Sequence, residues 1–227
     1  MLSVNKSNLK KLSCGILLAL SLSTGCSLVS DHNANLQPEA FGTLTHDSSW
    51  YEQQVSESSP EFTYDWQILL ARAYTVEGDF YKAKDIISQL RKNAVTPLQG
   101  NKADIAEAQI NIRQGKYREA YSLLSAVNTM SLSNADSAYY NLSIAKTEEA
   151  LGKNTDAAQH YIALSNIVTS AADKNDAISR TLIALSKSNK NDLIKGFKNS
   201  KTPYEKGFFE YALISQTKTK NQTNSAN

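Results

Sequence analysis

Glycine, proline and cysteine are scarce in this chain, whose 227 residues include 9 Gly, 4 Pro and 2 Cys. An all-β protein needs a turn about every 8–12 residues, so this shortage of turn-forming residues argues against that class. Glycine-rich phosphate-binding loops are excluded as well, because beyond residue 26 no two glycines lie closer than eleven positions apart. With 41% hydrophobic and 20% charged residues, the chain is too apolar to be disordered throughout and too polar for a membrane bundle. The composition favours an all-α globular domain.

The N-terminus has the pattern of a secretory signal. Three lysines and no acid fall within residues 1–11, and an apolar run follows from Cys14 to Leu22. This run of about nine apolar residues is too short for a transmembrane helix, since a bilayer requires about 20. Small residues then lead to Cys26. The pattern predicts an exported chain.

The segment Ser23-Thr-Gly-Cys26 resembles the lipobox of bacterial lipoproteins, in which a cysteine after a small residue receives diacylglycerol. It departs from that pattern at Ser23, where leucine is preferred. Because Cys14 leaves with the signal, the mature chain keeps one thiol, which cannot form an internal disulfide. We therefore predict lipidation of Cys26, with an ordinary cleaved signal as the alternative. Ser27 replaces the aspartate of an inner-membrane retention signal, which favours the outer membrane, facing the periplasm.

Three segments of the chain share one layout with a period of 37 residues. The recurring positions are Gly78, Gly115 and Gly152, then Ala83, Ala120 and Ala157, and before them Ala71, Ala108 and Ala145. Each unit has the pattern of a helix, a glycine turn and a second helix, because glycine ends a helix in a left-handed conformation without strain. The spacing resembles the tetratricopeptide repeat, whose usual period is about 34 residues. We predict an all-α, tetratricopeptide-like helical-hairpin solenoid.

The chain divides into four predicted parts. These are a lipoprotein signal peptide (1–25), a flexible spacer (26–47), the tetratricopeptide-like repeat domain (48–215) and a disordered polar tail (216–227). Toward the C-terminus the repeat pattern fades, with a turn expected near Asn189 and helices at 174–187 and 204–215. Such a degenerate pair is typical of the capping units that end a solenoid.

Residues with catalytic or metal-binding chemistry are rare in this sequence. Its three histidines, His32, His46 and His160, have no spacing that would close a metal site. A Gly-x-Ser-x-Gly nucleophile motif is absent, and a lipidated cysteine is no longer a thiolate nucleophile. Glu148 and Glu149 are adjacent, but neighbours on a helix point about 100° apart, so we interpret them as a solvated face. We predict a protein that is not an enzyme and has neither metal nor cofactor.

The charge is unevenly distributed along the chain. The formal charge of +2 falls to −1 when the three signal lysines are removed, and this near-neutral value excludes a nucleic-acid binder by composition. Residues 187–227, however, contain 8 lysines against 3 acids. Two interpretations stay open for the lysines of this end, namely contact with anionic lipid or wall polymers, or simple solubilisation of a terminal helix. The lysines concerned are Lys187, Lys190, Lys195, Lys198, Lys201 and Lys206.

The first helix of each unit carries the predicted binding surface. In tetratricopeptide repeats these helices line a concave groove that binds an extended segment or a helix of a partner. The same positions here are Asp65, Arg72, Thr75, Lys102, Gln109, Tyr139, Lys146 and Glu149, together with the apolar Ile68, Ile105, Ile112 and Leu142. A few anchors among such residues would dominate the affinity. The alternative is that these residues face water or a neighbouring helix.

The first repeat resembles the N-terminal domain of the LpoA family of penicillin-binding-protein activators. The likeness lies in Ser48-Ser-Trp-Tyr-Glu-Gln-Gln-Val, in Asp65-Trp-Gln-Ile-Leu-Leu-Ala-Arg-Ala-Tyr and in the turn at Glu77-Gly78, and it extends over roughly residues 48–190. The resemblance implies an outer-membrane lipoprotein that stimulates peptidoglycan cross-linking by a class A penicillin-binding protein. Family members continue into a large second domain implicated in docking the synthase, and this chain ends where that domain would begin.

We therefore expect a regulator of peptidoglycan synthesis whose partners are a class A penicillin-binding protein, outer-membrane lipid through Cys26, and peptidoglycan itself. The alternative is a helical-repeat adaptor lipoprotein that assists assembly of an outer-membrane complex such as a pilus secretin. The resemblance of the first helices favours the regulator over the adaptor. The absence of the family's second domain from this sequence weakens that preference.

Overall fold

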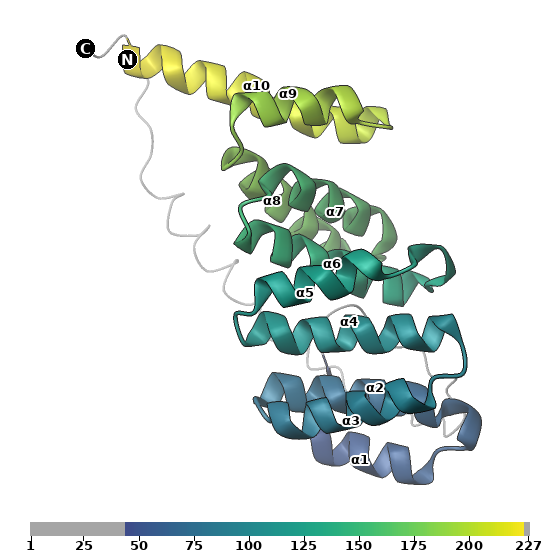
Figure 1. The fold of residues 1–227 in the computed structure, drawn as a ribbon. Coiled ribbons are helices and arrows are strands. Elements are labelled where there is room, and N and C mark those ends of the chain that lie inside the picture. The colour runs from purple at the N-terminus through teal and green to yellow at the C-terminus, as the bar shows by residue number, and fades with distance from the viewer. Residues whose placement is uncertain (1–43, 225–227) are drawn as a thin grey trace, which may run out of the picture. The chain divides into compact units, whose positions relative to one another are not determined.

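The computed structural model describes residues 44–224, with side chains described as far as residue 217. The predicted signal peptide, the lipidation site Cys26 and nearly all of the predicted spacer lie outside the described residues. Within them the chain forms α-helices and one short 3₁₀ helix, without a β-strand (Figure 1). The helices are α1 (Ser48–Glu57), α2 (Pro60–Glu77), α3 (Phe80–Asn93), α4 (Pro97–Arg113), α5 (Tyr117–Ala126), η1 (Thr129–Ser131), α6 (Asn134–Ala150), α7 (Asn154–Ile167), α8 (Ala171–Ser186), α9 (Lys190–Asn199) and α10 (Pro203–Asn224). The all-α prediction is confirmed.

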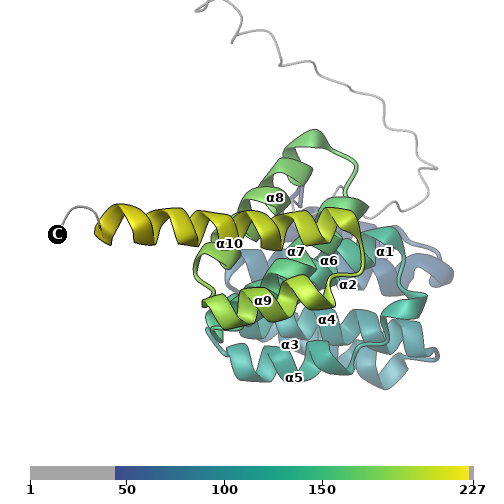
Figure 2. The same ribbon diagram turned by 90° about the horizontal axis from the view of Figure 1, so that it is seen from above.

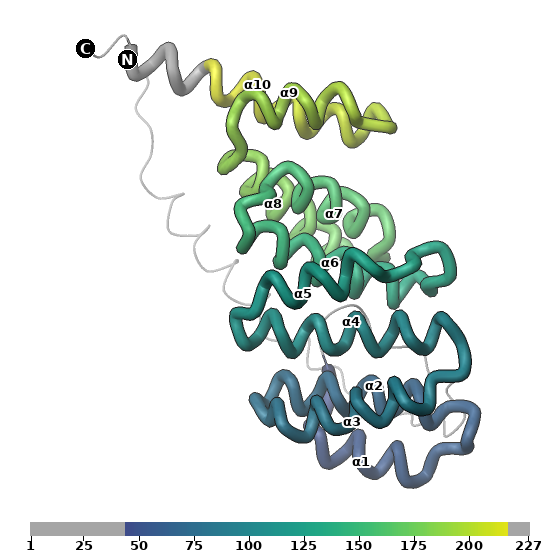
Figure 3. Tube along the Cα trace, viewed as in Figure 1, coloured from purple at the N-terminus to yellow at the C-terminus, as the bar shows by residue number. Residues whose placement is uncertain are grey.

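The helices pair into hairpins that stack in chain order (Figures 1 and 3). The hairpins α2–α3, α4–α5 and α6–α7 correspond to the three repeats of the sequence, and each packs on the next through α3–α4 and α5–α6. The first helices also contact one another, α2 against α4 and α4 against α6. These three helices therefore form one continuous layer, as in a tetratricopeptide-like fold.

The same turn ends the first helix of each hairpin. Gly78, Gly115 and Gly152 have φ angles of +87°, +72° and +76°, and in the described part of the chain positive φ is confined to these glycines. The residue after each glycine donates its backbone N–H to the carbonyl five residues earlier, at distances of 2.8–2.9 Å. This bond and the left-handed glycine define the Schellman motif, which satisfies carbonyls left open at a helix end.

The alanines that recur in the sequence are all buried in the structure. Ala83, Ala120 and Ala157 are fully buried on the second helices, and the equivalent alanines of the first helices are buried opposite them. Side chains without branches allow the helix backbones to approach, and close packing at this density tolerates little change in volume. Larger residues one turn after these alanines on the second helices, such as Leu124 and Tyr161, fill the core between hairpins.

The C-terminal end departs from the regular repeat. Helix α8 packs on α7, and α10 packs on α9 and α8 (Figure 2). A Cβ atom on Gly196 of α9 would lie 2.2 Å from the ring of Phe209 on α10, so glycine permits the close crossing of these helices. Asn189 caps α9 with its side chain, which agrees with the turn expected there.

Helix α10 corrects the expectation of disorder over residues 216–224, because the helix continues to Asn224. The segment has few apolar residues, but it contains no glycine or proline, and helix propagation is inexpensive once a helix is nucleated. Gln216 also ties the helix to its neighbour, since its side-chain amide donates to the carbonyl of Ser188 at 2.7 Å. None of the helices described between residues 44 and 224 is long and apolar enough to cross a membrane.

Candidate binding groove

The layer formed by α2, α4 and α6 presents one face with two ends of different character. Residues seven apart on a helix are two turns apart on the same side, so Asp65 and Arg72 share a face of α2, and Lys102 and Gln109 share a face of α4. The N-terminal halves of the three helices meet around Lys102, which we call the paired end. The middle and C-terminal parts of the same helices surround a cavity, which we call the cationic end.

At the paired end the lysine is held between two acids. The Nζ atom of Lys102 lies 2.8 Å from Oδ1 of Asp65 on α2 and 3.7 Å from Oδ2 of Asp136 on α6. The side chain of Lys102 is only 18% exposed, so these ion pairs are partly shielded from water. The arrangement ties α4 to both neighbouring helices.

The cavity of the cationic end has a volume of about 120 Å³. It is lined by Arg72, Thr75 and Val76 of α2, by Gln109, Ile112 and Arg113 of α4, and by Tyr139, Leu142, Ser143 and Lys146 of α6. The structure thus brings five of the eight predicted groove residues together at one cavity, namely Arg72, Thr75, Gln109, Tyr139 and Lys146. The predicted Asp65 and Lys102 lie at the paired end instead.

Contacts within the cavity fix several of its side chains. The guanidinium carbon of Arg72 lies 3.6 Å from the ring centroid of Tyr139, a cation–π contact between α2 and α6. The amide of Gln109 donates to the hydroxyl of Ser143 at 3.0 Å, which links α4 to α6. The hydroxyl of Thr75 is occupied by the carbonyl of Ala71 at 2.7 Å. The polar walls of the cavity are therefore held in place before any ligand arrives.

Lys146 has an electrostatically unfavourable position. Lys146 is exposed as a residue, but partial desolvation of its ammonium group, followed by the positive charges of Arg180 and Arg113, lowers its pKa below the usual range. Asp176 and Glu149 act in the opposite direction but do not cancel this effect. The cationic end therefore carries more positive charge than its surroundings balance.

Glu149, the last predicted groove residue, lies away from the cavity. Its carboxylate accepts a hydrogen bond from the hydroxyl of Tyr161 at 2.7 Å and lies 3.2 Å from the Nζ atom of Lys187. Burial, followed by the hydrogen bond to Glu149, raises the pKa of Tyr161. This glutamate joins α6 to α7 and to the end of α8, so it faces neighbouring helices.

The sequence interpretation of Glu148 as a solvated residue is wrong. Glu148 is 3% exposed, and its Oε2 atom, which has no hydrogen-bond donor, lies 3.8 Å from Nε2 of His160. Burial raises the pKa of Glu148 to about 8, and burial lowers the pKa of His160. The 37-residue repeat contained the signal, because the equivalent residues Tyr74 and Asn111 are buried too.

An apolar hollow of about 450 Å³ between α8 and α10 was not predicted. Its lining consists of Leu182, Pro203, Tyr204, Gly207, Phe208 and Tyr211. Tyr204 and Tyr211 remain exposed, by 41% and 61% respectively. Aromatic residues at i, i+4 and i+7 of α10 were the available signal, since this spacing places them on one side of a helix.

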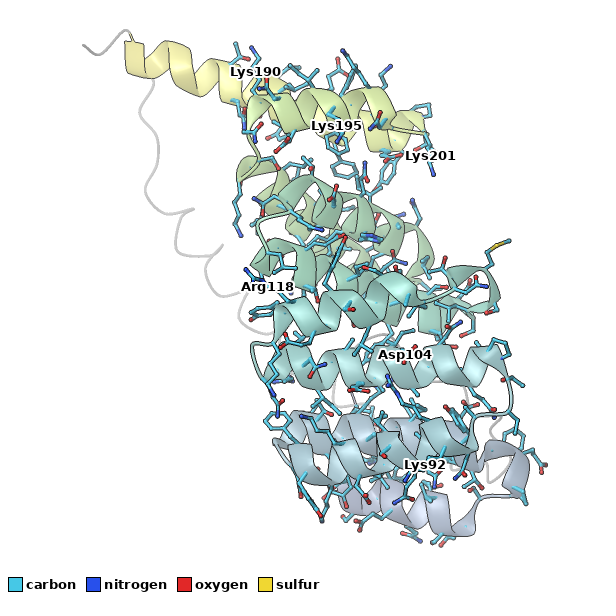
Figure 4. The ribbon with its side chains drawn as sticks, in the orientation of Figure 1. Lys92, Asp104, Arg118, Lys190, Lys195 and Lys201 are labelled. Carbon is cyan, nitrogen blue, oxygen red and sulfur yellow. The ribbon has the colours of Figure 1, made fainter. Side chains whose placement is uncertain are left out.

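The lysines of the basic end divide into two groups. Lys187 pairs with Glu149, and the Nζ atom of Lys206 lies 4.6 Å from the ring centroid of Phe197. Lys190, Lys195 and Lys201 are exposed along α9 and at the turn into α10 (Figure 4), and Lys198 of α9 is exposed as well. In the part of the chain that the structure describes, no group of three or more His, Cys, Asp or Glu side chains is placed to hold a metal ion.

Similarity to known proteins covers most of the chain. The family model described as "LppC putative lipoprotein" matches residues 43–226. The penicillin-binding protein activator LpoA of Erwinia tasmaniensis is 31% identical over 173 residues, which are 75% of this chain and 25% of that protein. The protein of the same name from Pantoea ananatis is 31% identical over 183 residues, or 79% of this chain and 26% of its own length. The chain thus spans about a quarter of the length of these curated relatives.

A solved structure supports the fold assignment. The crystal structure of the amino-terminal domain of LpoA from E. coli aligns with a TM-score of 0.63 at 24% identity, covering 75% of each chain. The resemblance predicted from the first repeat is therefore confirmed and extends over the stacked hairpins. The chain belongs to the LppC lipoprotein family, and its helical repeats correspond to the N-terminal domain of LpoA.

Proposed function

We propose that this chain is an outer-membrane lipoprotein, facing the periplasm, that regulates peptidoglycan synthesis by activating a class A penicillin-binding protein. Relatives with about 30% identity are named as penicillin-binding protein activators, and the family is one of lipoproteins. The names describe activators and not enzymes, which supports a regulatory role without catalysis of its own. In this proposal the chain uses no metal or cofactor and binds no nucleic acid.

Attachment to the membrane is assigned to Cys26. Several acyl chains on one residue give the stable anchoring that a single chain cannot supply. The spacer at 26–47 would then separate the helical domain from the lipid surface and bring it toward the peptidoglycan, which is a further candidate contact. Replacing Cys26 by serine is expected to release the protein from the outer-membrane fraction, and membrane fractionation would measure this.

The observation that carries the binding proposal is the cavity between α2, α4 and α6. It combines a stacked arginine, two more cations and apolar side chains on helices fixed by packing. Interfaces gain most of their affinity from a few such anchors, arginine and tyrosine being the commonest among them. The proposed partner-binding residues are accordingly Arg72, Thr75, Gln109, Tyr139 and Lys146.

The test compares two double charge reversals of the full chain in detergent. Arg72→Glu with Lys146→Glu alters the cavity, whereas Lys92→Glu with Arg118→Glu alters exposed positions on α3 and α5 (Figure 4). We expect the first pair to weaken binding to a class A penicillin-binding protein by about tenfold or more and to abolish stimulation of cross-linking. The control pair should change neither. Equal behaviour of the two pairs would remove the cavity from the proposal.

The adaptor alternative is supported by a different surface. The open apolar hollow between α8 and α10 exposes aromatic side chains, and exposed apolar patches mark interaction sites. Crosslinking in intact cells with a tagged chain separates the hypotheses. Capture of secretin or assembly components without a penicillin-binding protein would favour the adaptor, and capture of the synthase would favour the regulator.

A further inference from the structure

The cationic end contains three positive side chains and no acid. Arg72, Arg113 and Lys146 come from three different helices and all line the cavity, whose remaining lining is neutral. Among the ion pairs of the described residues, none involves these three cations, in contrast to Lys102 at the paired end. Their charges are therefore available to a ligand.

The carboxylates nearest to Lys146 already have partners. Asp176 pairs with Arg180, with 2.7 Å between Nε and Oδ2. Glu149 is engaged by Lys187 and by the hydroxyl of Tyr161. Neither acid is free to neutralise the cavity from within the fold.

Arg72 supplies a second, independent sign of a missing ligand. Its Nε atom is buried and has no hydrogen-bond acceptor. A buried donor without an acceptor is costly, so a ligand oxygen that reaches this guanidinium group would be strongly favoured. The ring of Tyr139 holds the guanidinium group in place, and a fixed planar guanidinium matches the geometry of a carboxylate.

The size and the lining of the cavity limit what can enter. About 120 Å³ is room for several water molecules, since one needs about 10–15 Å³. Val76, Ile112 and Leu142 add apolar surface beside the cations. This mixture suits a carboxylate on a short aliphatic stem, as in a glutamate side chain, better than a ligand that is polar all round.

We propose that the cavity between α2, α4 and α6 is a carboxylate-binding site, which accepts a glutamate side chain from an acidic segment of a protein partner. Arg72 is the donor to the carboxylate, and Arg113 and Lys146 supply the surrounding positive charge. The inference rests on the proposed function only in taking a protein as the partner. Binding of the anion should raise the pKa of Lys146, because it adds the negative charge that this lysine lacks.

The experiment measures binding of a synthetic peptide with alternating Glu and Leu residues to the full chain in detergent, against the same peptide with Gln for Glu. We expect the Glu peptide to bind at least about tenfold more tightly, with a difference that shrinks at high salt. Arg72→Gln and Lys146→Gln should each lower its affinity by about threefold to tenfold. The matched controls Arg118→Gln and Lys92→Gln should leave it unchanged. Calorimetry at about pH 10, just below the ordinary lysine pKa of 10.5, in buffers of different ionisation enthalpy should show proton uptake in the unaltered chain and none in Lys146→Gln.

Other outcomes would overturn the inference. Equal binding of the Glu and Gln peptides, or full binding by folded Lys146→Gln, would show that the cavity does not select a carboxylate. Complete competition by inorganic phosphate at equal concentration would indicate an unspecific anion site, and tighter binding of soluble muropeptides would make the wall the ligand. Peptide binding without any stimulation of a penicillin-binding protein would leave the inference standing and refute the proposed function. Stimulation of the penicillin-binding protein that survives Arg72→Gln and Lys146→Gln would leave the proposed function standing and refute the inference.

Discussion

The two ends of the groove differ although the same three helices build both. At the paired end, Lys102 of α4 lies between Asp65 and Asp136, so each neighbour contributes a charge of opposite sign. At the cationic end, two turns farther along, each helix contributes a cation and none contributes an acid. Charged side chains of one helical layer can therefore have different roles. A charge with an ion-pair partner joins two helices, whereas a charge without one is available to bind a ligand.

The helix dipoles explain part of this difference. The C-terminal ends of α2, α4 and α6 carry partial negative charge, which favours nearby cations by about 0.3–1 kcal/mol each. This accounts for a basic residue such as Arg113 in the last turn of α4. It does not supply an acceptor for the Nε atom of Arg72, which remains unsatisfied. The helix dipoles therefore stabilise nearby cations slightly but do not neutralise their charge.

The largest expected effect belongs to Glu148, a buried acid of α6 that lacks the partners of Asp65 and Asp136. Because its pKa is raised from 4.5 to about 8 in the folded state, the unfolded chain loses this proton first as the pH rises. The contribution of Glu148 to folding stability is therefore fully present below pH 4.5 and is lost progressively up to about pH 8. We expect Glu148→Gln to stabilise the protein by ~3 kcal/mol at pH 8.5 and by little at pH 4.5.

Denaturant unfolding of the full chain at the two pH values measures this difference. His160, which is buried beside Glu148, is present in both proteins, so its own loss of stability at low pH largely cancels in the comparison. Glu210→Gln, at an exposed position in the interior of α10, is the control and should leave the free energy of unfolding unchanged at both pH values. If the free energies of unfolding of the unaltered protein and of Glu148→Gln change with pH in the same way, the pKa of Glu148 is not raised by folding.

The second prediction breaks the paired end. Lys102→Met keeps the length of the side chain but removes the charge, which leaves Asp65 and Asp136 facing each other without a cation. We expect a loss of about 1–2 kcal/mol in the free energy of unfolding, between the values typical of exposed and buried pairs. Combining the change with Asp65→Asn should recover part of the loss. If Lys102→Met is as stable as the unaltered chain, these ion pairs do not hold the helices together.

Periodicity predicted the hairpins because it reports backbone geometry that every unit must repeat. The glycines needed a left-handed conformation and the alanines a close helix crossing, and both requirements recur in each unit. The same reasoning placed Arg72, Gln109 and Lys146 on one face of the first helices, where the structure finds the cavity. Regular features of the fold could therefore be predicted from the sequence.

The features that could not be predicted depend on individual partners. Glu149 and Lys146 lie three residues apart on the same helix, yet Glu149 turns to Tyr161 and Lys187 on other helices. The repeat indicated that position 148 is buried, but the contact of Glu148 with His160 of the next helix is specific to this unit and no local pattern shows it. The packing of α9 on α10 through Gly196 departs from the repeat, so the period gave no information there.

The smallest expected effect lies at the cationic end, where removing a positive charge should not lower the free energy of unfolding. The lowered pKa of Lys146 means that its charged form is disfavoured in the fold at neutral pH, and that this penalty disappears above the unfolded pKa of 10.5. We expect Lys146→Gln to leave stability at pH 7 unchanged or to raise it by ~0.5 kcal/mol, with no gain at about pH 11.5, above the unfolded pKa. Denaturant unfolding at both pH values, beside Lys102→Met, tests this directly. A loss of stability comparable to that of Lys102→Met would mean that Lys146 holds the fold together as Lys102 does, and that the two ends of the groove do not differ in purpose.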